Sequence, residues 1–87
     1  MAVDPNMPIL IVDDYKTMLR IIRNLLRQLN FTNIEEATDG SMALRKLREK
    51  SFSLVISDWN MEPMTGLQLL KEVRADTKLK DLPFIMI

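Results

Sequence analysis

Residues 9–15 read ILIVDDY, in which four aliphatic side chains run directly into two carboxylates, Asp13 and Asp14. The aliphatic run does not alternate with polar residues, and this pattern indicates a strand that is covered on both faces. Such strands are typical of parallel sheets, because helices pack on both sides of these sheets. The segment therefore predicts a buried parallel strand at residues 9–12 that ends on paired acids.

The next part of the chain alternates between helical and strand patterns. Residues 15–29 predict a helix, residues 34–37 a short strand, and the TDG turn at residues 38–40 the start of a second helix. From their spacing, the inward side chains of the first helix are expected to be Met18, Ile22, Leu25, Leu26 and Leu29.

The second half of the chain continues this alternation. Residues 53–57, SLVIS, predict another buried strand, and Asp58 follows it directly. Thr65 is expected to cap a third helix, and residues 84–87, FIMI, to form a last strand after Pro83. The third helix is expected to turn inward Leu67, Leu70 and either Val73 or Leu69.

This order of elements predicts an α/β domain with a doubly wound parallel sheet. Alternating strands and helices with short connections form parallel sheets, and their crossovers are right-handed. With the first strand between the second and the third, the first helix covers one face of the sheet and the next two helices cover the other. Ligands of such sheets bind at the carboxyl ends of the strands, where the strand order reverses.

The composition excludes several classes of site. The chain of 87 residues has 12 basic and 12 acidic residues and neither histidine nor cysteine. Zero formal charge argues against a nucleic-acid partner, and the missing residue types exclude disulfides, thiolate zinc sites and triads with histidine. Residues 1–8 lack the pattern of a signal peptide and no apolar run is long enough for a membrane, so we expect a cytoplasmic protein.

Asp13, Asp14 and Asp58 are expected to converge at one edge of the sheet. They follow strands that the topology makes neighbours, and neighbouring strands lie about 5 Å apart. Like charges held this close raise one another's pKa, and a divalent cation relieves the repulsion. Mg²⁺ suits an open site of oxygen ligands that keeps several waters and accepts a phosphate oxygen.

Asp58 is the candidate phosphoacceptor. Aspartate carboxylates attack phosphoryl groups and form acyl phosphates, and this transfer needs positioning and neutralisation of charge rather than a histidine. Asp58 stands alone at its strand end, whereas Asp13 and Asp14 form the pair opposite that holds the ion.

The stretches ILIVDDY, ATDGSMAL, LVISDWNM, MTG and LPFIMI resemble the receiver domain of bacterial two-component response regulators. The resemblance covers essentially the whole chain, and DDYKTM together with SDWNM looks closest to the single-domain chemotaxis (CheY-like) branch. It implies a flavodoxin-like sheet of strand order 2-1-3-4. Residues 1–87 are then the N-terminal part of a single receiver domain, truncated before the fifth strand and the last two helices.

The resemblance also implies a function. Asp58 is implied to accept a phosphoryl group from a histidine kinase, in a signalling domain with self-catalysed phosphotransfer and dephosphorylation rather than in an enzyme. The implied setting is chemotaxis, with an effector such as the flagellar motor switch as partner and with neither nucleic acid nor a membrane. Mg²⁺, or Mn²⁺ in its place, is implied to be held by Asp13, Asp14, Asp58 and the backbone carbonyl of Asn60.

Two departures from the family pattern stand out. Glu62 lies between Met61 and Pro63, whereas the family usually has proline directly after that methionine. A complete receiver also has a Ser or Thr after the fourth strand and a Lys after the fifth, and both contact the phosphoryl oxygens. Without them, phosphorylation of the 87-residue chain is expected to be weak and short-lived.

Two alternative functions remain open. The first is a phosphorylation-incompetent receiver fragment that forms a dimer or larger homo-oligomer, since residues 84–87 would be an uncharged edge strand beside bare apolar surface. The second is a phosphohydrolase of the haloacid dehalogenase type, which also uses a strand-end Asp with Mg²⁺. That class has a second Asp where this chain has Asn60, and Asn cannot act as the acid or base.

Overall fold

The structure is a computed structural model and describes residues 4–62 and 64–87. Its strands and helices alternate along the chain, as the sequence predicts. The bounds predicted for the four strands and the first helix agree with the structure to within one residue. The strands are β1 (Ile9–Val12), β2 (Ile34–Ala37), β3 (Leu54–Ser57) and β4 (Phe84–Met86), and the helices are α1 (Lys16–Gln28), α2 (Gly40–Glu49) and α3 (Gly66–Ala75).

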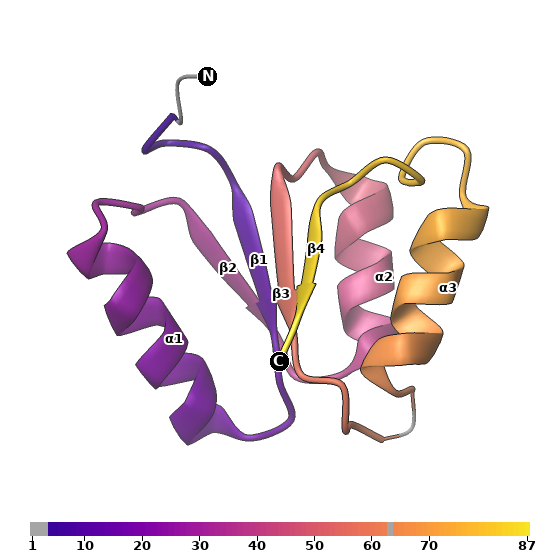
Figure 1. Ribbon diagram of the computed structural model, residues 1–87, viewed down its shortest axis with the longest axis horizontal. Helices are drawn as coiled ribbons and strands as arrows, with labels where there is room; N and C mark the ends of the chain where they lie inside the picture. Colours follow the sequence, from indigo (N-terminus) through magenta and orange to yellow (C-terminus); the bar gives the residue numbers. More distant parts are fainter. Residues whose placement is uncertain (1–3, 63) are drawn as a thin grey trace.

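The strands form one parallel sheet in the order β2-β1-β3-β4, which confirms the predicted doubly wound topology. β1 lies in the interior of the sheet, and all of its side chains are buried. This position accounts for its uninterrupted aliphatic sequence, because helices cover both faces of a central parallel strand. The carboxyl ends of all strands lie at the same edge of the sheet (Figure 1).

α1 lies on one side of the sheet, and α2 and α3 lie on the other, as predicted (Figure 1). Alternate residues of β1 point to the two sides: Ile9 and Ile11 pack with α1, whereas Leu10 and Val12 pack with α2 and α3. Two apolar layers result, one on each face of the sheet. No helix within residues 4–62 and 64–87 combines the length and the apolar character needed to cross a membrane.

The inner face of α1 differs from the prediction. Its buried side chains are Leu19, Ile22 and Leu26, whereas Leu25 and Leu29 are 55% and 65% exposed. The spacing of apolar residues predicts which side of a helix is apolar, but it does not show how much of that side the sheet covers. Here the apolar side of α1 is wider than the surface on which it packs.

Arg23 holds α1 over β2. Its Nε donates to Oε2 of Glu36 at 2.8 Å, and its Nη2 donates to the carbonyl of Ile34 at 3.3 Å. Successive residues turn by about 100° around a helix axis, so Leu25 and Leu29 lie on the other side of α1 from Arg23. The two exposed leucines therefore face the half of the sheet that is formed by β3 and β4.

α3 also turns a different side to the core than predicted. Leu69 and Val73 are buried, whereas Leu67 is 50% exposed and Leu70 is only half-buried. Leu69 and Val73 lie four residues apart on one side of the helix, and this side packs against the apolar layer that contains Leu10 and Val12. The prediction that named Leu67 as an inward residue is therefore wrong.

Side-chain caps fix the first turns of α2 and α3. Asp39 accepts a hydrogen bond from the backbone N–H of Met42 at 2.8 Å. Thr65 caps α3, as predicted: its Oγ1 accepts from the N–H of Gln68 at 3.1 Å, and the Gln68 side chain accepts from the N–H of Thr65 at 2.9 Å. This reciprocal capping box satisfies N–H groups that have no partner inside the helix.

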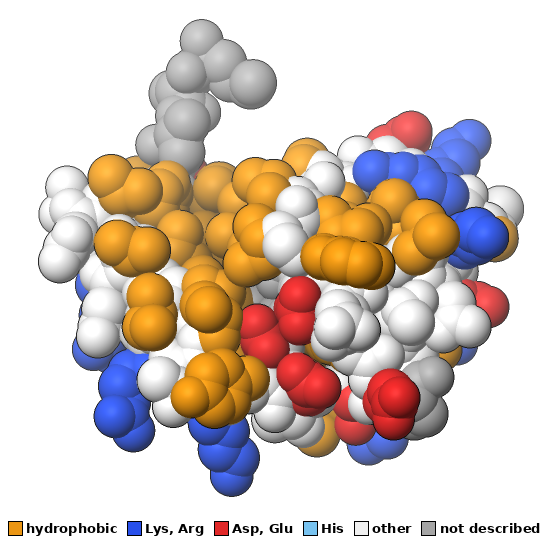
Figure 2. Space-filling model, turned by 60° about the horizontal axis from the view of Figure 1, so that its bottom comes forward, with side chains coloured by type: hydrophobic (Ala, Val, Ile, Leu, Met, Phe, Trp, Pro, Cys, Tyr) orange, Lys and Arg blue, Asp and Glu red, His pale blue; other side chains and the backbone are white. Residues whose placement is uncertain are grey.

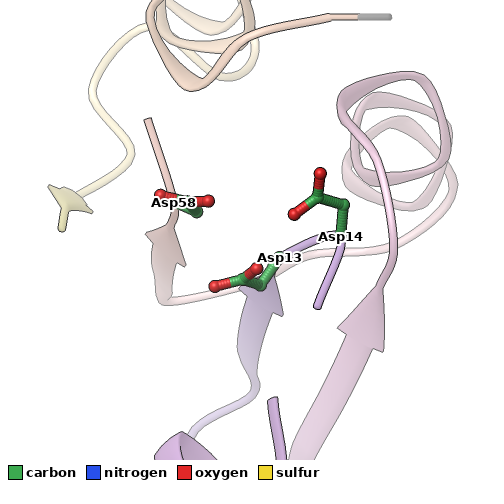
Figure 3. A group of neighbouring side chains, drawn as sticks. All are labelled: Asp13, Asp14 and Asp58. Carbon is green, nitrogen blue, oxygen red and sulfur yellow. The ribbon is translucent and has the colours of Figure 1, made fainter. Parts of the chain in front are cut away.

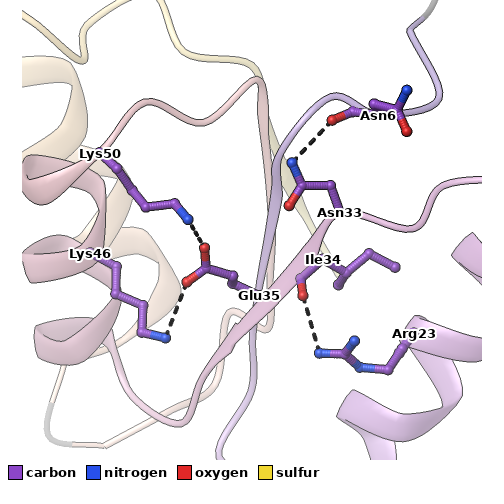
Figure 4. A network of polar contacts seen from close by, with 7 residues as sticks. All are labelled: Asn6, Arg23, Asn33, Ile34, Glu35, Lys46 and Lys50. Atoms are coloured by element: carbon purple, nitrogen blue, oxygen red, sulfur yellow. Dashed lines mark hydrogen bonds and ion pairs between the residues drawn. The ribbon is translucent and has the colours of Figure 1, made fainter.

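Glu35 joins β2 to α2 through two lysines. Its carboxylate accepts from Lys50 and lies 3.6 Å from Nζ of Lys46 (Figure 4). The hydrogen bond from Lys50 is the largest cause of a lowered pKa of Glu35, and the charge of Lys46 adds to it against a smaller opposing effect of burial. Ionised Glu35 is therefore favoured in the folded protein.

Glu35→Gln is expected to make the free energy of unfolding less dependent on pH in the acidic range. Because folding lowers the Glu35 pKa from its ordinary value of 4.5, the stabilisation is complete above that value and is lost as the pH falls through the folded pKa. Urea denaturation at several acidic pH values measures this dependence. Glu49→Gln, an exposed change on α2, serves as the matched control; equal pH profiles for both variants would contradict the role of Glu35.

Candidate functional site

Three carboxylates meet at the carboxyl ends of the central strands. Asp13 and Asp14 follow β1 and Asp58 follows β3, and the structure brings all of them together as predicted. One carboxylate oxygen from each lies within 4.8 Å of the other two. The three side chains point into one shared space (Figure 3). Asp13 is buried, Asp58 is half-buried and Asp14 is exposed, so the cluster is open to solvent on one side.

The register of the sheet places these acids side by side. Val12 of β1 pairs with Ser57 of β3, and the next residue on each strand is an aspartate. The N–H of Asp58 donates to the carbonyl of Val12 at 2.9 Å, and the N–H of Asp13 donates to the carbonyl of Ala37 at 3.1 Å. The backbones of Asp13 and Asp58 are therefore fixed by the same hydrogen bonds that hold the strands together.

The three negative charges oppose one another. The pKa of Asp13 is raised, first by burial of its carboxyl group and further by the charges of Asp58 and Asp14. A hydrogen bond from the N–H of Tyr15 to Oδ1 of Asp13, at 2.9 Å, acts in the opposite direction and fixes the orientation of the carboxyl group. Repulsion of this kind is relieved when a cation lies between the carboxylates.

The three acids line an open cavity of about 470 Å³. Its remaining walls are partly apolar, with Tyr15, Met18 and Ile87 beside the acids, and no Lys or Arg is among its lining residues in the part of the chain that the structure describes. Figure 2 shows acidic side chains near the middle of this end of the molecule, next to hydrophobic ones. The apolar wall is a feature that the sequence interpretation missed.

The donor atoms fit a magnesium ion. The site offers carboxylate oxygens from three residues, and Mg²⁺ binds through one or two carboxylates while it keeps several waters. Asn60, whose backbone carbonyl is a predicted ligand, also lines the cavity. When bound, Mg²⁺ supplies positive charge that neutralises carboxylates and phosphoryl oxygens.

The segment after Asp58 is held on both sides. The N–H of Trp59 donates to the carbonyl of Ile87 at 3.2 Å, and the N–H of Gly66 donates to the carbonyl of Trp59 at 3.0 Å. The N–H of Asn60 donates to Oδ1 of Asp58 at 3.3 Å. Trp59 itself is 60% exposed beside the acids and can report on them by fluorescence.

Comparison with known proteins identifies the family of the chain. Residues 9–87 match the family described as response regulator receiver domain. The chain belongs to this family. Receiver domains are signalling domains of two-component systems rather than classical enzymes, and they generally bind Mg²⁺ at an acidic pocket. This chain has a cluster of three aspartates at the corresponding edge of its sheet.

Relatives of this receiver chain have chemotaxis names. It is 56% identical over 82 residues to chemotaxis protein CheY-3 of Vibrio cholerae, covering 94% of this chain and 63% of the relative. It is 57% identical over 81 residues to chemotaxis protein CheY of Pseudomonas aeruginosa, covering 93% of this chain and 65% of the relative. The chain thus spans less than two thirds of the length of these curated relatives.

Solved receiver structures have the same fold. The chemotaxis response regulator CheY4 of Vibrio cholerae superimposes with a TM-score of 0.86 at 33% sequence identity. The match covers 93% of this chain and 67% of that protein. The flavodoxin-like order of strands 2-1-3-4 is therefore shown both by the sheet itself and by this likeness.

Asp13→Asn is expected to raise the melting temperature of the metal-free protein at neutral pH. Folding raises the Asp13 pKa, so ionisation of this group costs stability at any pH above the folded pKa. Asparagine removes the charge, and its Oδ1 can still accept from the N–H of Tyr15. Calorimetry without Mg²⁺ should give Asp13→Asn a higher melting temperature than the wild type. Addition of Mg²⁺ should then raise the melting temperature of the variant less than that of the wild type.

Asp81→Asn is the matched control for this measurement, because Asp81 is exposed and lies outside the cavity that the three acids line. It should melt like the wild type and show the same gain on adding Mg²⁺. A melting temperature of Asp13→Asn at or below that of the wild type would contradict the repulsion inferred for the cluster.

Proposed function

We propose that the chain is a phosphorylation-dependent signalling receiver that accepts a phosphoryl group on Asp58. The proposed Mg²⁺ ligands are Asp13, Asp14, Asp58 and the backbone carbonyl of Asn60, with Mn²⁺ as a substitute. The single observation that supports this most is the convergence of three carboxylate side chains within 4.8 Å at the carboxyl ends of β1 and β3.

In the proposed reaction, a carboxylate oxygen of Asp58 attacks the phosphorus atom of the donor. The new oxygen–phosphorus bond forms while the bond between phosphorus and the leaving group breaks, and the electron pair of that bond departs with the leaving group. The product is an acyl phosphate, which water later hydrolyses to restore the carboxylate. Asp13 and Asp14 would hold the cation, which would supply positive charge beside the phosphoryl oxygens.

Asp58 suits the role of acceptor better than the other two acids. Asp13 is buried, so a phosphodonor reaches its carboxylate less easily than that of the half-buried Asp58. Asp14 is exposed, so its side chain is held less firmly than that of Asp58. Attack on phosphorus is faster when the attacking oxygen is held in one position. Asp58 is half-buried, its backbone is fixed to β1, and its side chain points into the open cavity.

The setting of the reaction is proposed from the relatives. Their chemotaxis names support a histidine kinase as phosphodonor and an effector such as the flagellar motor switch, in the cytoplasm. Residues 1–87 are then the N-terminal part of a single receiver domain, with self-catalysed phosphotransfer and dephosphorylation.

Asp58→Asn is expected to abolish phosphoryl incorporation from acetyl phosphate, because the amide is a far weaker nucleophile than the carboxylate. Intact mass spectrometry after incubation with Mg²⁺ measures incorporation, and Asp81→Asn should behave like the wild type. The wild type should accept at most one phosphoryl group per chain, and this modification is expected to be weak and short-lived. Incorporation that survives in Asp58→Asn would overturn the assignment. Fast release of many phosphate ions per chain, rather than slow hydrolysis of a single acyl phosphate, would favour a phosphohydrolase.

A second proposal concerns an apolar strip on the side of the sheet that α1 covers only in part. Ile85 pairs with Ile56, and Ile56 packs in the layer beneath α1, so Ile85 and Ile87 point to that same side. Both are nearly half exposed. We use the name apolar strip for the exposed apolar side chains on this side of the sheet that α1 and the end of the chain contribute, namely Leu25, Leu29, Ile85 and Ile87.

We propose that a second copy of the 87-residue chain covers the apolar strip. The strip contains no charged side chain, so it is best matched by an apolar surface, and an isologous pair sets the strip against itself. Among residues 4–62 and 64–87, β3 is the one strand that pairs with β4, and strands at the edge of a sheet commonly pair with another chain. Burial of apolar area at about 25 cal/mol per Å² favours this association.

The 87-residue chain is therefore expected to self-associate as its concentration rises, which light scattering measures. Leu25→Glu should return it to a monomer, because a charge would be buried in the interface. Leu67→Glu is the matched control, since Leu67 is similarly exposed but lies on α3, on the other side of the sheet. A compact monomer at every concentration would rule out the association.

A further inference from the structure

The chain has two glycines, Gly40 and Gly66, and each is the first residue of a helix. Neither has a positive φ, so backbone conformation does not require glycine at either position. Their surroundings differ. A Cβ atom at Gly40 would lie 2.8 Å from side-chain atoms of Met64, whereas a Cβ atom at Gly66 would lie 2.3 Å from the carbonyl oxygen of Asp58 and 2.6 Å from Cα of Trp59.

At Gly40 an added methyl group would meet Cβ, Cγ and Sδ of Met64, so Met64 would have to shift, but no backbone atom is among these neighbours. At Gly66 it would meet backbone atoms of Asp58 and Trp59, and this backbone is held from both sides. On one side, the N–H of Asp58 is bonded to β1 and the N–H of Trp59 to Ile87. On the other side, the capping box of Thr65 and the fully buried Leu69 hold the first turn of α3. The N–H of Gly66 also donates directly to the carbonyl of Trp59.

We propose that Gly66 is a positioning residue for the phosphoacceptor and metal site. The absence of a side chain lets the start of α3 lie directly against the backbone of Asp58 and Trp59. This contact determines where the Asp58 carboxylate and, two residues further along, the Asn60 carbonyl lie. The inference rests on the proposed Mg²⁺ site and adds to it a residue that does not itself bind the ion.

Magnesium makes such a site sensitive to small displacements. A methyl group at Gly66 and the Asp58 carbonyl must separate by about 1 Å to reach ordinary van der Waals contact. Mg²⁺ requires nearly octahedral geometry with ligands at about 2.0–2.1 Å, so a shift of this size moves Asp58 out of position. Loss of groups that orient metal ligands typically lowers metal affinity about 10–100-fold.

The test compares Gly66→Ala with Gly40→Ala, the same substitution at the same position of another helix. Mg²⁺ affinity is measured by isothermal titration calorimetry and by Trp59 fluorescence, well below the melting temperature of each variant. Gly66→Ala should bind Mg²⁺ about tenfold more weakly than the wild type or worse. Gly40→Ala should keep the wild-type affinity, because the contact that it disturbs is with Met64 and not with the backbone of Asp58 or Trp59.

Each other outcome counts against the proposal in a defined way. If Gly66→Ala melts earlier but binds Mg²⁺ as tightly as the wild type, Gly66 is merely structural and the inference is overturned. If Gly40→Ala loses as much affinity, the effect belongs to helix starts in general, and the inference is again overturned. If the wild type itself binds no Mg²⁺, the proposed metal site fails, and the inference fails with it.

A measurement on the wild type covers the case in which Gly66→Ala does not fold. Labelling with ¹⁵N-glycine gives two backbone signals, because the chain contains two glycines. Addition of Mg²⁺ should shift the signal of Gly66, whose N–H donates to the Trp59 carbonyl, more than that of Gly40. A Gly66 signal that does not respond while Trp59 fluorescence reports binding overturns the inference.

Discussion

In-register parallel pairing of β1 with β3 is the constraint on which the candidate site depends. It aligns Val12 with Ser57, so the aspartates that follow these residues leave the sheet side by side. No long side chain has to reach across the molecule, because each carboxylate follows a strand whose position is fixed by backbone hydrogen bonds. If β3 slipped by one residue along β1, Asp58 would move away from Asp13, and the side chains of the two residues would point to opposite faces of the sheet.

The two sides of the sheet are covered to different extents. α2 and α3 pack side by side against one face, where Leu10, Val12, Leu69 and Val73 are almost completely buried. On the other face, α1 is held over β2 by Arg23, and apolar side chains of α1 and β4 stay exposed. The asymmetry follows from the strand order, since one crossover lies on the side of α1 and two lie on the other.

The sequence was sufficient to predict the order of the elements and the meeting of the three acids. Both depend on local patterns: aliphatic runs of strand length, and an aspartate directly after two of them. The inward role predicted for Leu25 and Leu67 was wrong, because periodicity identifies an apolar side of a helix but not the extent of the surface that covers it. Tyr15 and Ile87 in the cavity wall depend on side-chain directions that the sequence does not contain.

The contact of Gly66 with the Asp58 backbone could not be predicted either, because the two residues are eight positions apart in the sequence and no local pattern brings them together. The sequence shows that a glycine stands at the start of a helix, but it does not show which part of the protein packs against that glycine. Gly40 and Gly66 each follow a capping residue at the start of a helix, and only the structure shows that the neighbour of Gly40 is the Met64 side chain, whereas that of Gly66 is the backbone of Asp58 and Trp59.

The two backbone hydrogen bonds of Ile87 have a consequence for communication across the molecule. Its N–H donates to Ser57, and its carbonyl accepts from Trp59, so the outer edge of the sheet and the segment after Asp58 share one residue. A chemical event at the carboxylates that displaces Trp59 would be transmitted to β4 without any hinge. Such coupling is reciprocal. If a molecule docked on β4 shifts Ile87 and changes the affinity of the acids for a cation by some factor, the cation changes the affinity for that molecule by the same factor.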